Sequence, residues 1–344
     1  MNNRHVIVHA RDKEVAEIVF YERAVEIANL MLGKLDRNIK RIFPEDYQDL
    51  PRKNLRAGKA DIKGKWREVE NFCRDNFEGA SPKNIAALYE PLYSHRGKYR
   101  LPLIEFIRIV GKPLEGRLKG APLHSTVCLS PWGLQTEFPE AHLVLDIAFA
   151  YNAILKLKAD IDEVEARKLS WSDAKKEKDE IAQKQSEMKY NMRMCLICCF
   201  NLIEAYINGI AWEYVKTKGT SSLSENQRKM IEGDQTSILE KLVKIPRIIA
   251  GRDSSPLNKE EPPLSEFRDI IKPYRDSIVH ASPYSAPEKF GGYDKLSKIY
   301  ELNPDIVKRA VDISLEIISK IHKFVGAERE FPQWIPTRNS NGLF

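Results

Sequence analysis

Cysteine is scarce in this chain of 344 residues, which has only Cys73, Cys128, Cys195, Cys198 and Cys199. Because the number is odd, these residues cannot form a complete set of intramolecular disulfides. Small folds held together by disulfides are therefore excluded, and the cysteine usage suits a reducing compartment. We expect a cytoplasmic protein.

The sequence also lacks the motifs of the commoner enzyme classes. It has no glycine-rich phosphate loop, no His-Glu-x-x-His pair and no Gly-x-Ser-x-Gly elbow, which excludes the usual nucleotide, metalloprotease and hydrolase sites. Cys195, Cys198 and Cys199 share one side of a helix and could form a corner of a zinc site, but no fourth ligand lies nearby. Since their neighbours are apolar, we favour core packing for the three thiols and expect no metal and no other cofactor.

Long apolar runs are nearly absent. The one stretch that approaches transmembrane length, Met194 to Trp212, has Glu204 at its middle, with Asn201 and Asn208 on either side. Such side chains are costly in a bilayer, so a buried helix is the favoured interpretation and we expect no membrane partner. The first residues have charges close to their only apolar run and no small-residue cleavage site, so we expect no secretory signal.

The net charge of +6 comes from one region. Residues 51–100 hold 12 basic and 6 acidic side chains, whereas the rest of the chain holds 43 of each. Tyrosines lie among the basic residues of the stretch 91–119. A basic surface with aromatic side chains can bind along the phosphate backbone of a nucleic acid. A merely solvated surface is the alternative. The candidate RNA-binding residues of this basic stretch (91–119) are Arg96, Lys98, Arg100, Arg117 and Lys119.

Helical periodicity runs through most of the chain, and we expect a mainly α protein. Apolar residues recur at three- and four-residue steps, as in amphipathic helices, at 15–42, 59–76, 104–110, 224–246, 264–281 and 304–325. Ser81-Pro82 and Asn303-Pro304 each provide an N-cap followed by proline at the first helical position. One strand is expected at 125–129 among closely spaced prolines and glycines.

The composition changes after Pro139, where glycine is missing until Gly209 and proline until Pro246. We therefore expect a mostly helical N-terminal domain at 1–138, a helical domain with a long charged helix at 139–330, and a C-terminal tail at 331–344. The densely charged segment 158–189 is expected to form a solvated helix or helical hairpin without a chemical role.

One group of residues late in the sequence points to chemistry. Arg275, Asp276 and His280 lie near the end of the expected helix 264–281. Asp276 and His280 are four residues apart and share a face, so the carboxylate can orient the imidazole and favour its protonated form. Arg275 and His280 diverge by about 140° on one helix, but the arginine supplies a permanent cation for a phosphate. The alternative is a helix end whose dipole these side chains satisfy.

The C-terminal region, about 185–326, resembles the HEPN domain, a helical family of RNases, toxins and defence proteins. The likeness rests on CCFNLIEAYINGIAWEYV with its central acid Glu204, on EKLVKIPRIIAG, on YRDSIVHA and on NPDIVKRAVDISLEIISKIHKF. The family motif is an arginine and a histidine four to six residues apart. Carried over by position it gives Arg275, Asp276 and His280, with Glu204 and Tyr284 in support. Asp276 departs from the asparagine that the family often has after the arginine.

The resemblance implies a HEPN-like helical bundle and metal-independent RNA cleavage, usually in a homodimer whose two motifs face each other. We expect a toxin or antiviral effector that cuts RNA by His/Arg acid–base chemistry and leaves 2′,3′-cyclic phosphate ends, with an antitoxin or regulatory protein as a further candidate partner. Two alternatives stay open: a catalytically inactive HEPN module that binds RNA, nucleotide or a protein, and a structural helical protein. Residues 1–138 lie outside the likeness.

Overall fold

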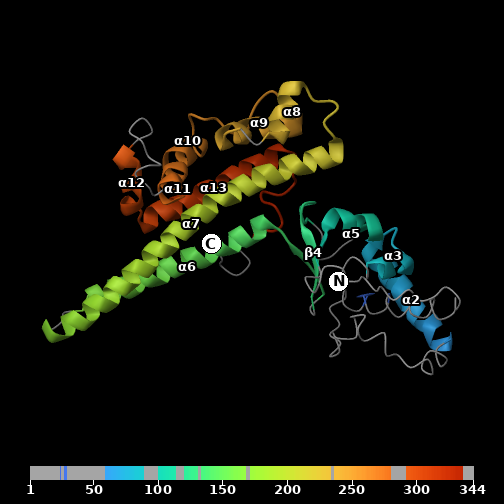
Figure 1. Ribbon diagram of the computed structural model, residues 1–344, viewed down its shortest axis with the longest axis horizontal. Coiled ribbons are helices and arrows are strands. Elements are labelled where there is room, and N and C mark those ends of the chain that lie inside the picture. Colours follow the sequence, from blue (N-terminus) through green and yellow to red (C-terminus); the bar gives the residue numbers. More distant parts are fainter. Residues whose placement is uncertain are drawn as a thin grey trace, which may run out of the picture. The chain divides into compact units, whose positions relative to one another are not determined.

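The computed structural model describes residues 24, 27–28, 59–88, 100–113, 120–130, 133–167, 171–233, 236–279 and 292–335. The chain divides into two compact units, Met1–Phe138 and Pro139–Phe344. The division falls where glycine and proline become rare in the sequence. Helices make up most of the described residues, so the fold is mainly α (Figure 1).

The described part of unit 1 combines three helices with two small antiparallel sheets. Its helices are α2 (Lys59–Asn76), α3 (Pro82–Ala87) and α5 (Leu103–Val110). As predicted, the Ser81 side chain accepts a hydrogen bond from the backbone N–H of Asn84, and Pro82 begins α3. Of the expected helix 15–42 only Ala24, Ile27 and Ala28 are described, and all three are helical and buried.

The strands of unit 1 outnumber the single one that the sequence predicts. The predicted strand is β4 (Thr126–Ser130), which lies between β2 (Arg100–Pro102) and β5 (Gly133–Glu137). Strands β1 (Phe77–Glu78) and β3 (Lys112–Pro113) form the second sheet. The other four strands have two to five residues each, and β2, β3 and β5 contain Pro or Gly. Such segments are too short for an alternating pattern to show, which is why these four strands were not predicted.

A glycine makes the connection between α5 and β3 possible. Gly111 has φ +78°, and a Cβ atom at this position would lie 1.7 Å from the backbone oxygen of Glu78 in the paired strand β1. Any larger residue would separate the two strands. The sheets and helices enclose an apolar core in which the ring of Phe77 packs edge-on against the rings of Phe72 and Phe106.

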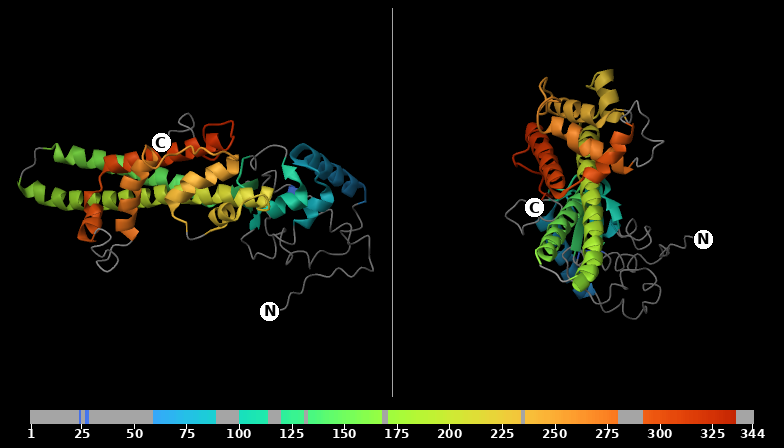
Figure 2. Two further views of the ribbon diagram at one scale, coloured as in Figure 1. Left: turned by 90° about the horizontal axis from the view of Figure 1, so that it is seen from above. Right: turned by 90° about the vertical axis from the view of Figure 1, so that its left-hand side faces the viewer.

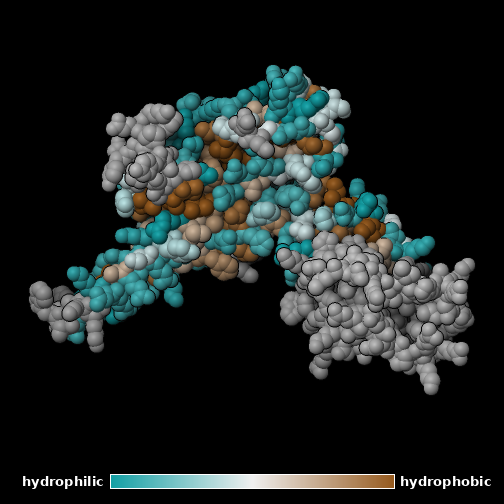
Figure 3. Space-filling model, in the orientation of Figure 1, coloured by the Kyte–Doolittle hydropathy of each residue, from teal (hydrophilic) through white to brown (hydrophobic). Residues whose placement is uncertain are grey.

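Unit 2 is built on a helical hairpin of α6 (Pro139–Glu165) and α7 (Trp171–Lys218), which lie side by side in both orientations (Figures 1 and 2). The charged segment 158–189 forms the end of this hairpin, as the sequence predicts. There the Lys184 ammonium lies 3.6 Å from the Asp160 carboxylate of the other helix. The end of the hairpin is hydrophilic on the face shown in Figure 3.

The apolar half of α7 is the centre of unit 2. The part of α7 from Glu177 to Lys218 is long and apolar enough to cross a membrane, but 61% of its most apolar window is buried inside the protein. Cys195, Cys198, Cys199 and Tyr206 are among its buried side chains. This burial agrees with the buried helix that the sequence predicts for this segment.

Among the described residues of unit 2, seven shorter helical segments follow α7 in the chain. They are α8 (Glu225–Glu232), α9 (Ile238–Ala250), α10 (Leu264–Glu266), the π-helical turn η3 (Phe267–Ile271), α11 (Lys272–Val279), α12 (Gly292–Glu301) and α13 (Pro304–Phe324). Asn303 caps α13 as predicted, accepting hydrogen bonds from the N–H groups of Asp305 and Ile306. Helix α12 was not predicted from the sequence.

The prediction of one helix over 224–246 was wrong in two respects. Gly233 ends α8, and Ser237 begins a separate helix by accepting a hydrogen bond from the N–H of Glu240. Helix α9 also continues through Pro246 to Ala250, where Gly251 ends it in a left-handed conformation. The apolar contacts of α9 with α7 and α13 outweigh the hydrogen bond that proline removes.

The first residues of the expected C-terminal tail belong to unit 2. Ile335 is buried, and Phe331 and Trp334 pack on the same core. The Trp334 ring lies 6.3 Å from the ring of Tyr206 on α7. Residues 336–344 lie outside the described residues.

All five cysteines are free and buried. Burial raises the pKa of the Cys73 and Cys198 thiols to about 11, so both stay protonated and are poor nucleophiles at neutral pH. The burial of Cys195, Cys198 and Cys199 agrees with the core packing that we favoured over a corner of a zinc site. Within the described ranges, no group of three or more His, Cys, Asp and Glu side chains is arranged to hold a metal ion.

Candidate active site at the end of helix α11

The candidate motif lies on a helical segment that runs without a break from Leu264 to Val279. Phe267, Ile271 and Tyr274 are buried and anchor this segment to the core of unit 2. Ser277 is also buried and donates its hydroxyl hydrogen bond to the backbone oxygen of Tyr274, at 2.7 Å. Arg275 and Asp276 lie between these buried positions near the end of the helix, and both side chains are partly buried.

Two cations neutralise Asp276. The Arg275 Nη1 atom donates to Asp276 Oδ1 at 2.9 Å, and the Lys272 Nζ atom donates to Oδ2 at the same distance. Each carboxylate oxygen thus receives one charged donor, and the group of three side chains keeps one net positive charge. Lys272 is four residues before Asp276, so this pair could have been read from the sequence.

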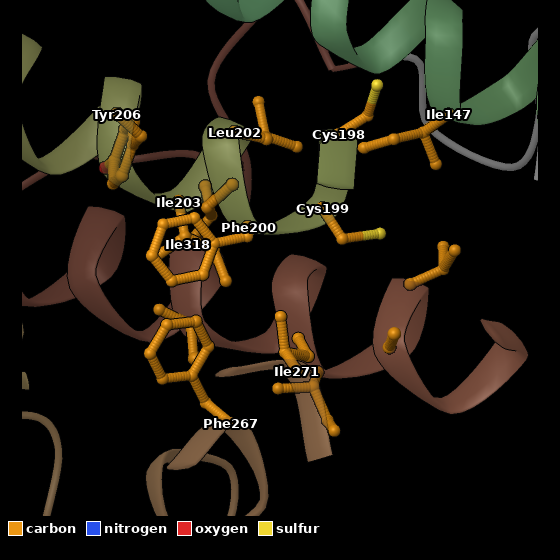
Figure 4. Close-up of a cluster of buried hydrophobic side chains, with 14 of the residues drawn as sticks. Ile147, Cys198, Cys199, Phe200, Leu202, Ile203, Tyr206, Phe267, Ile271 and Ile318 are labelled. Carbon is orange, nitrogen blue, oxygen red and sulfur yellow. The ribbon is translucent and has the colours of Figure 1, made fainter. Parts of the chain in front are cut away.

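An aromatic ring holds the other side of Arg275. The guanidinium carbon lies 4.5 Å from the centre of the Phe200 ring on α7. The Phe200 ring is in turn stacked on the Phe267 ring of η3, with centres 5.7 Å apart (Figure 4). A guanidinium between a carboxylate and a ring face has a defined position without using all its donors. Phe200 could not be predicted as a neighbour of Arg275, because only the tertiary structure brings α7 against α11.

A second Arg-Asp dipeptide lies seven residues earlier. Arg268 donates to both carboxylate oxygens of Asp269, at 2.8 and 3.1 Å, and its Nη1 atom also contacts Glu260 and the backbone oxygen of Lys259. These hydrogen bonds lower the pKa of Asp269 and raise the pKa of Arg268. The Arg268 guanidinium is therefore fully engaged by the protein, unlike that of Arg275.

Helix α12 adds a further cation near α11. The Lys298 ammonium lies 5.7 Å from the centre of the Tyr274 ring and pairs with Glu301 at 2.7 Å. Burial raises the pKa of Tyr274. Tyr274 is therefore a neutral packing residue at physiological pH, and its ring fixes α12 against α11.

The expected supporting acid, Glu204, is half-buried on α7, one turn after Phe200. The structure records no hydrogen bond or ion pair that joins Glu204 to any residue it describes. A direct role for Glu204 in holding Arg275 is therefore without support.

His280 and Tyr284 lie outside the described residues. Val279, the residue before His280, ends α11 and is half exposed to solvent. The described geometry therefore covers the arginine and the aspartate of the motif.

Of the expected RNA-binding residues in unit 1, only Arg100 is described. Its Nη2 atom lies 2.6 Å from a carboxylate oxygen of Glu137 in β5. This ion pair already neutralises Arg100, so its charge is less available to a phosphate than the sequence suggested. Arg96, Lys98, Arg117 and Lys119 lie outside the described residues.

Comparisons of the chain with protein families, with curated proteins and with solved structures give no match.

Proposed function

We propose that the protein is a metal-independent endoribonuclease of the HEPN type, with Arg275, Asp276 and His280 as its catalytic group. The observation that carries the proposal is the Arg275 guanidinium, which Phe200 and Asp276 position while several of its N–H donors have no partner among the described residues. A positioned cation with unused donors is what a phosphate ester needs in order to bind.

The reaction requires three functions that these side chains supply. A base removes the proton of the ribose 2′-hydroxyl as its oxygen attacks the adjacent phosphorus, and the bond from phosphorus to the 5′-oxygen breaks as that oxygen takes up a proton. The products are a 2′,3′-cyclic phosphate and a 5′-hydroxyl. We assign proton transfer to His280 and stabilisation of the phosphorane charge to Arg275, with Lys272 adding positive potential.

Asp276 has a positioning role in this proposal. It holds Arg275 through one oxygen, and four residues separate it from His280 along the chain, as in one helical turn. A carboxylate near the imidazole favours the protonated form, which is the state that protonates the leaving oxygen.

The decisive experiment incubates the purified full-length protein with total RNA in EDTA and maps the new ends. We expect cleavage with cyclic phosphate ends, and a loss of cleavage in His280→Ala. Cleavage that stops in EDTA, or that continues undiminished in His280→Ala, would contradict the proposal. Circular dichroism of the variant checks that it folds.

A dimer is part of the proposal, because one helix separates Arg275 and His280 by about 140° and a second copy can bring the two types of side chain together. Light scattering that shows a fully active monomer would exclude this requirement. We place the enzyme in the cytoplasm, as a toxin or antiviral effector.

We further propose that the basic stretch of unit 1 binds the RNA. The affinity should then fall with salt, with a slope near −0.7 for each phosphate contacted on a single strand. Replacing Arg96 and Lys98 by alanine should flatten this slope. Arg100→Ala should change it less, because Glu137 already pairs with Arg100. An unchanged slope in the double variant would contradict RNA binding by this stretch and support the alternative of a solvated surface.

The alternative is a catalytically inactive module that binds RNA, nucleotide or a protein partner. One observation favours it: Arg275 and Lys272 both contact Asp276, and this arrangement also serves a purely structural helix end. RNA binding without cleavage would select this alternative.

A further inference from the structure

A cavity of about 640 Å³ lies in unit 2, away from α11, between helices α8 and α9 and the loop that follows α9. Its volume falls in the range of sites for small organic ligands, roughly 300 to 1,000 Å³. Figures 1 and 2 show α8 and α9 near the C-terminal end of α7, whereas α11 lies closer to its middle. The cavity is therefore separate from the candidate active site.

The cavity is lined by three cations and one anion. Lys244 and Arg247 come from one face of α9, and Arg252 and Asp253 come from the loop after it. The lining residues thus carry a net charge of +2, and Glu240, outside the lining, pairs with Lys244. A positive lining of this kind favours an anionic ligand such as a phosphate monoester. Cations at the end of a helix also satisfy its dipole, but that role does not require them to surround a cavity.

Two of the three cations are held in place and one is not. Arg252 lies with its guanidinium carbon 5.0 Å from the centre of the Phe324 ring, and the Lys244 ammonium is 2.5 Å from a carboxylate oxygen of Glu240. The Arg247 side chain forms no ion pair and no hydrogen bond with any residue that the structure describes. It is half-buried at the cavity wall, so its donors are available to a ligand.

The other residues that line the cavity indicate which chemical group could accompany the phosphate. Met230 of α8 and Ile248 of α9 are apolar, and Asn226 and Gln227 line the cavity beside them. The Gln227 side-chain oxygen accepts from the backbone N–H of Ser224, so its amide N–H donors remain for a ligand. Methionine and isoleucine pack well against a flat organic group, and the amides can bind its polar edge. We propose that this cavity binds a small phosphate monoester with a planar organic group, with Arg247 as the main phosphate ligand.

Titration calorimetry on the full-length protein tests this proposal with three probes: adenosine 5′-monophosphate, adenosine and inorganic phosphate. The first probe has both chemical parts, and the other two have one each. We expect adenosine 5′-monophosphate to bind at least about tenfold more tightly than either part, because a charge-assisted hydrogen bond contributes more than a neutral one. Adenosine that binds as tightly would overturn the phosphate assignment, and no binding of any probe at millimolar concentration would overturn the site.

Three variants locate the bound phosphate. Arg247→Gln should weaken binding of adenosine 5′-monophosphate about tenfold or more, and Lys244→Gln, at an exposed position, should weaken it less. Arg228→Gln is the matched control, because Arg228 is on α8, contacts the backbone oxygen of Thr220 and does not line the cavity. Unchanged affinity in both Arg247→Gln and Lys244→Gln would overturn the proposal.

Arg275→Gln separates this site from the candidate active site. We expect it to leave the affinity for adenosine 5′-monophosphate unchanged. Loss of binding in Arg275→Gln but not in Arg247→Gln would place the ligand at α11 and overturn the proposal. Since every readout is binding, failure here says nothing against RNA cleavage, and failure of RNA cleavage leaves this test intact.

Discussion

The two Arg-Asp dipeptides of one helical segment have the same local sequence and different surroundings. Arg268 and Asp269 are 38% and 60% exposed, and the Arg268 donors are satisfied by Asp269, Glu260 and a backbone oxygen. Arg275 and Asp276 are only 26% and 14% exposed, and Phe200 supports the arginine. In the first pair, the protein uses every nitrogen of the arginine as a donor. In the second pair, the arginine is held in position and still has donors that the described residues do not use.

The π-helical turn η3 contains the first of the two dipeptides and precedes the second. Arg268 and Asp269 are inside this wider turn, and Arg275 follows it on regular helix. A π-helical turn rotates the residues that follow it relative to a continuous α-helix. The dipeptide by itself therefore does not determine whether an arginine is a surface ion pair or a candidate phosphate ligand.

Arginine variants test this contrast with the largest expected effect. Arg275→Ala should reduce the rate of RNA cleavage by roughly 10² to 10³, the usual loss when one donor to a developing negative charge is removed. Arg268→Ala should leave the rate within about twofold, since exposed ion pairs contribute little. The measurement is the initial rate on one RNA substrate for both variants. Equal losses would show that the contrast has no functional meaning.

The aromatic support of Arg275 is tested through stability. Phe200→Ala should lower the free energy of unfolding by about 3 kcal/mol or more, because a buried ring that stacks on Phe267 is lost. Phe200→Leu keeps most of the volume and should cost less, but it removes the ring face from Arg275. Chemical denaturation gives both values. If Phe200→Leu cleaves RNA at the full rate, the contact between Phe200 and Arg275 is unimportant for activity.

Replacing Asp276 or Asp269 by asparagine compares the stability contribution of the two Arg-Asp pairs. Asp276→Asn leaves Lys272 and Arg275 without their shared counter-ion, and should lower the free energy of unfolding by ~1 kcal/mol. Asp269→Asn, at an exposed position, should cost less than ~0.5 kcal/mol. Asp276→Asn should also steepen the salt dependence of RNA binding, which filter binding can measure. Equal free energies of unfolding for the two variants would show that the two ion pairs contribute equally to stability.

The smallest expected effect is on the pH dependence of stability, through His322, which is far in sequence from both Arg-Asp pairs. Burial lowers the pKa of His322 on α13, whose Nδ1 atom is 3.4 Å from the Tyr206 hydroxyl. The unfolded state therefore binds a proton more readily, and stability is lost as pH falls below the ordinary histidine pKa of about 6.5. His322→Gln should weaken this acid-induced loss, measured as the melting temperature between pH 7 and pH 5. The pH profile of RNA cleavage should keep its shape in this variant, because His322 is not part of the motif.

Much of the fold could be predicted from residue patterns. Helix α2, the cap of α3 and the cap of α13 were predicted where the structure has them, because periodicity and capping are local properties. The break between α8 and α9 and the extension of α9 past Pro246 were not, because contacts with other helices decide them. The same division applies to the site: Arg275 and Asp276 are visible as a motif, and Phe200 is not.

The sequence by itself determined that the chain is mainly helical, that its most apolar segment is a core helix, and that its positive charge comes from residues 51–100. These properties depend on spacing and composition, which folding does not change. Only the tertiary structure decided that Phe200 supports Arg275, that Glu137 neutralises Arg100, and that Arg247 faces a cavity. The physical reason is that whether a charged side chain is free or paired depends on neighbours that are distant along the chain, and packing alone brings them together.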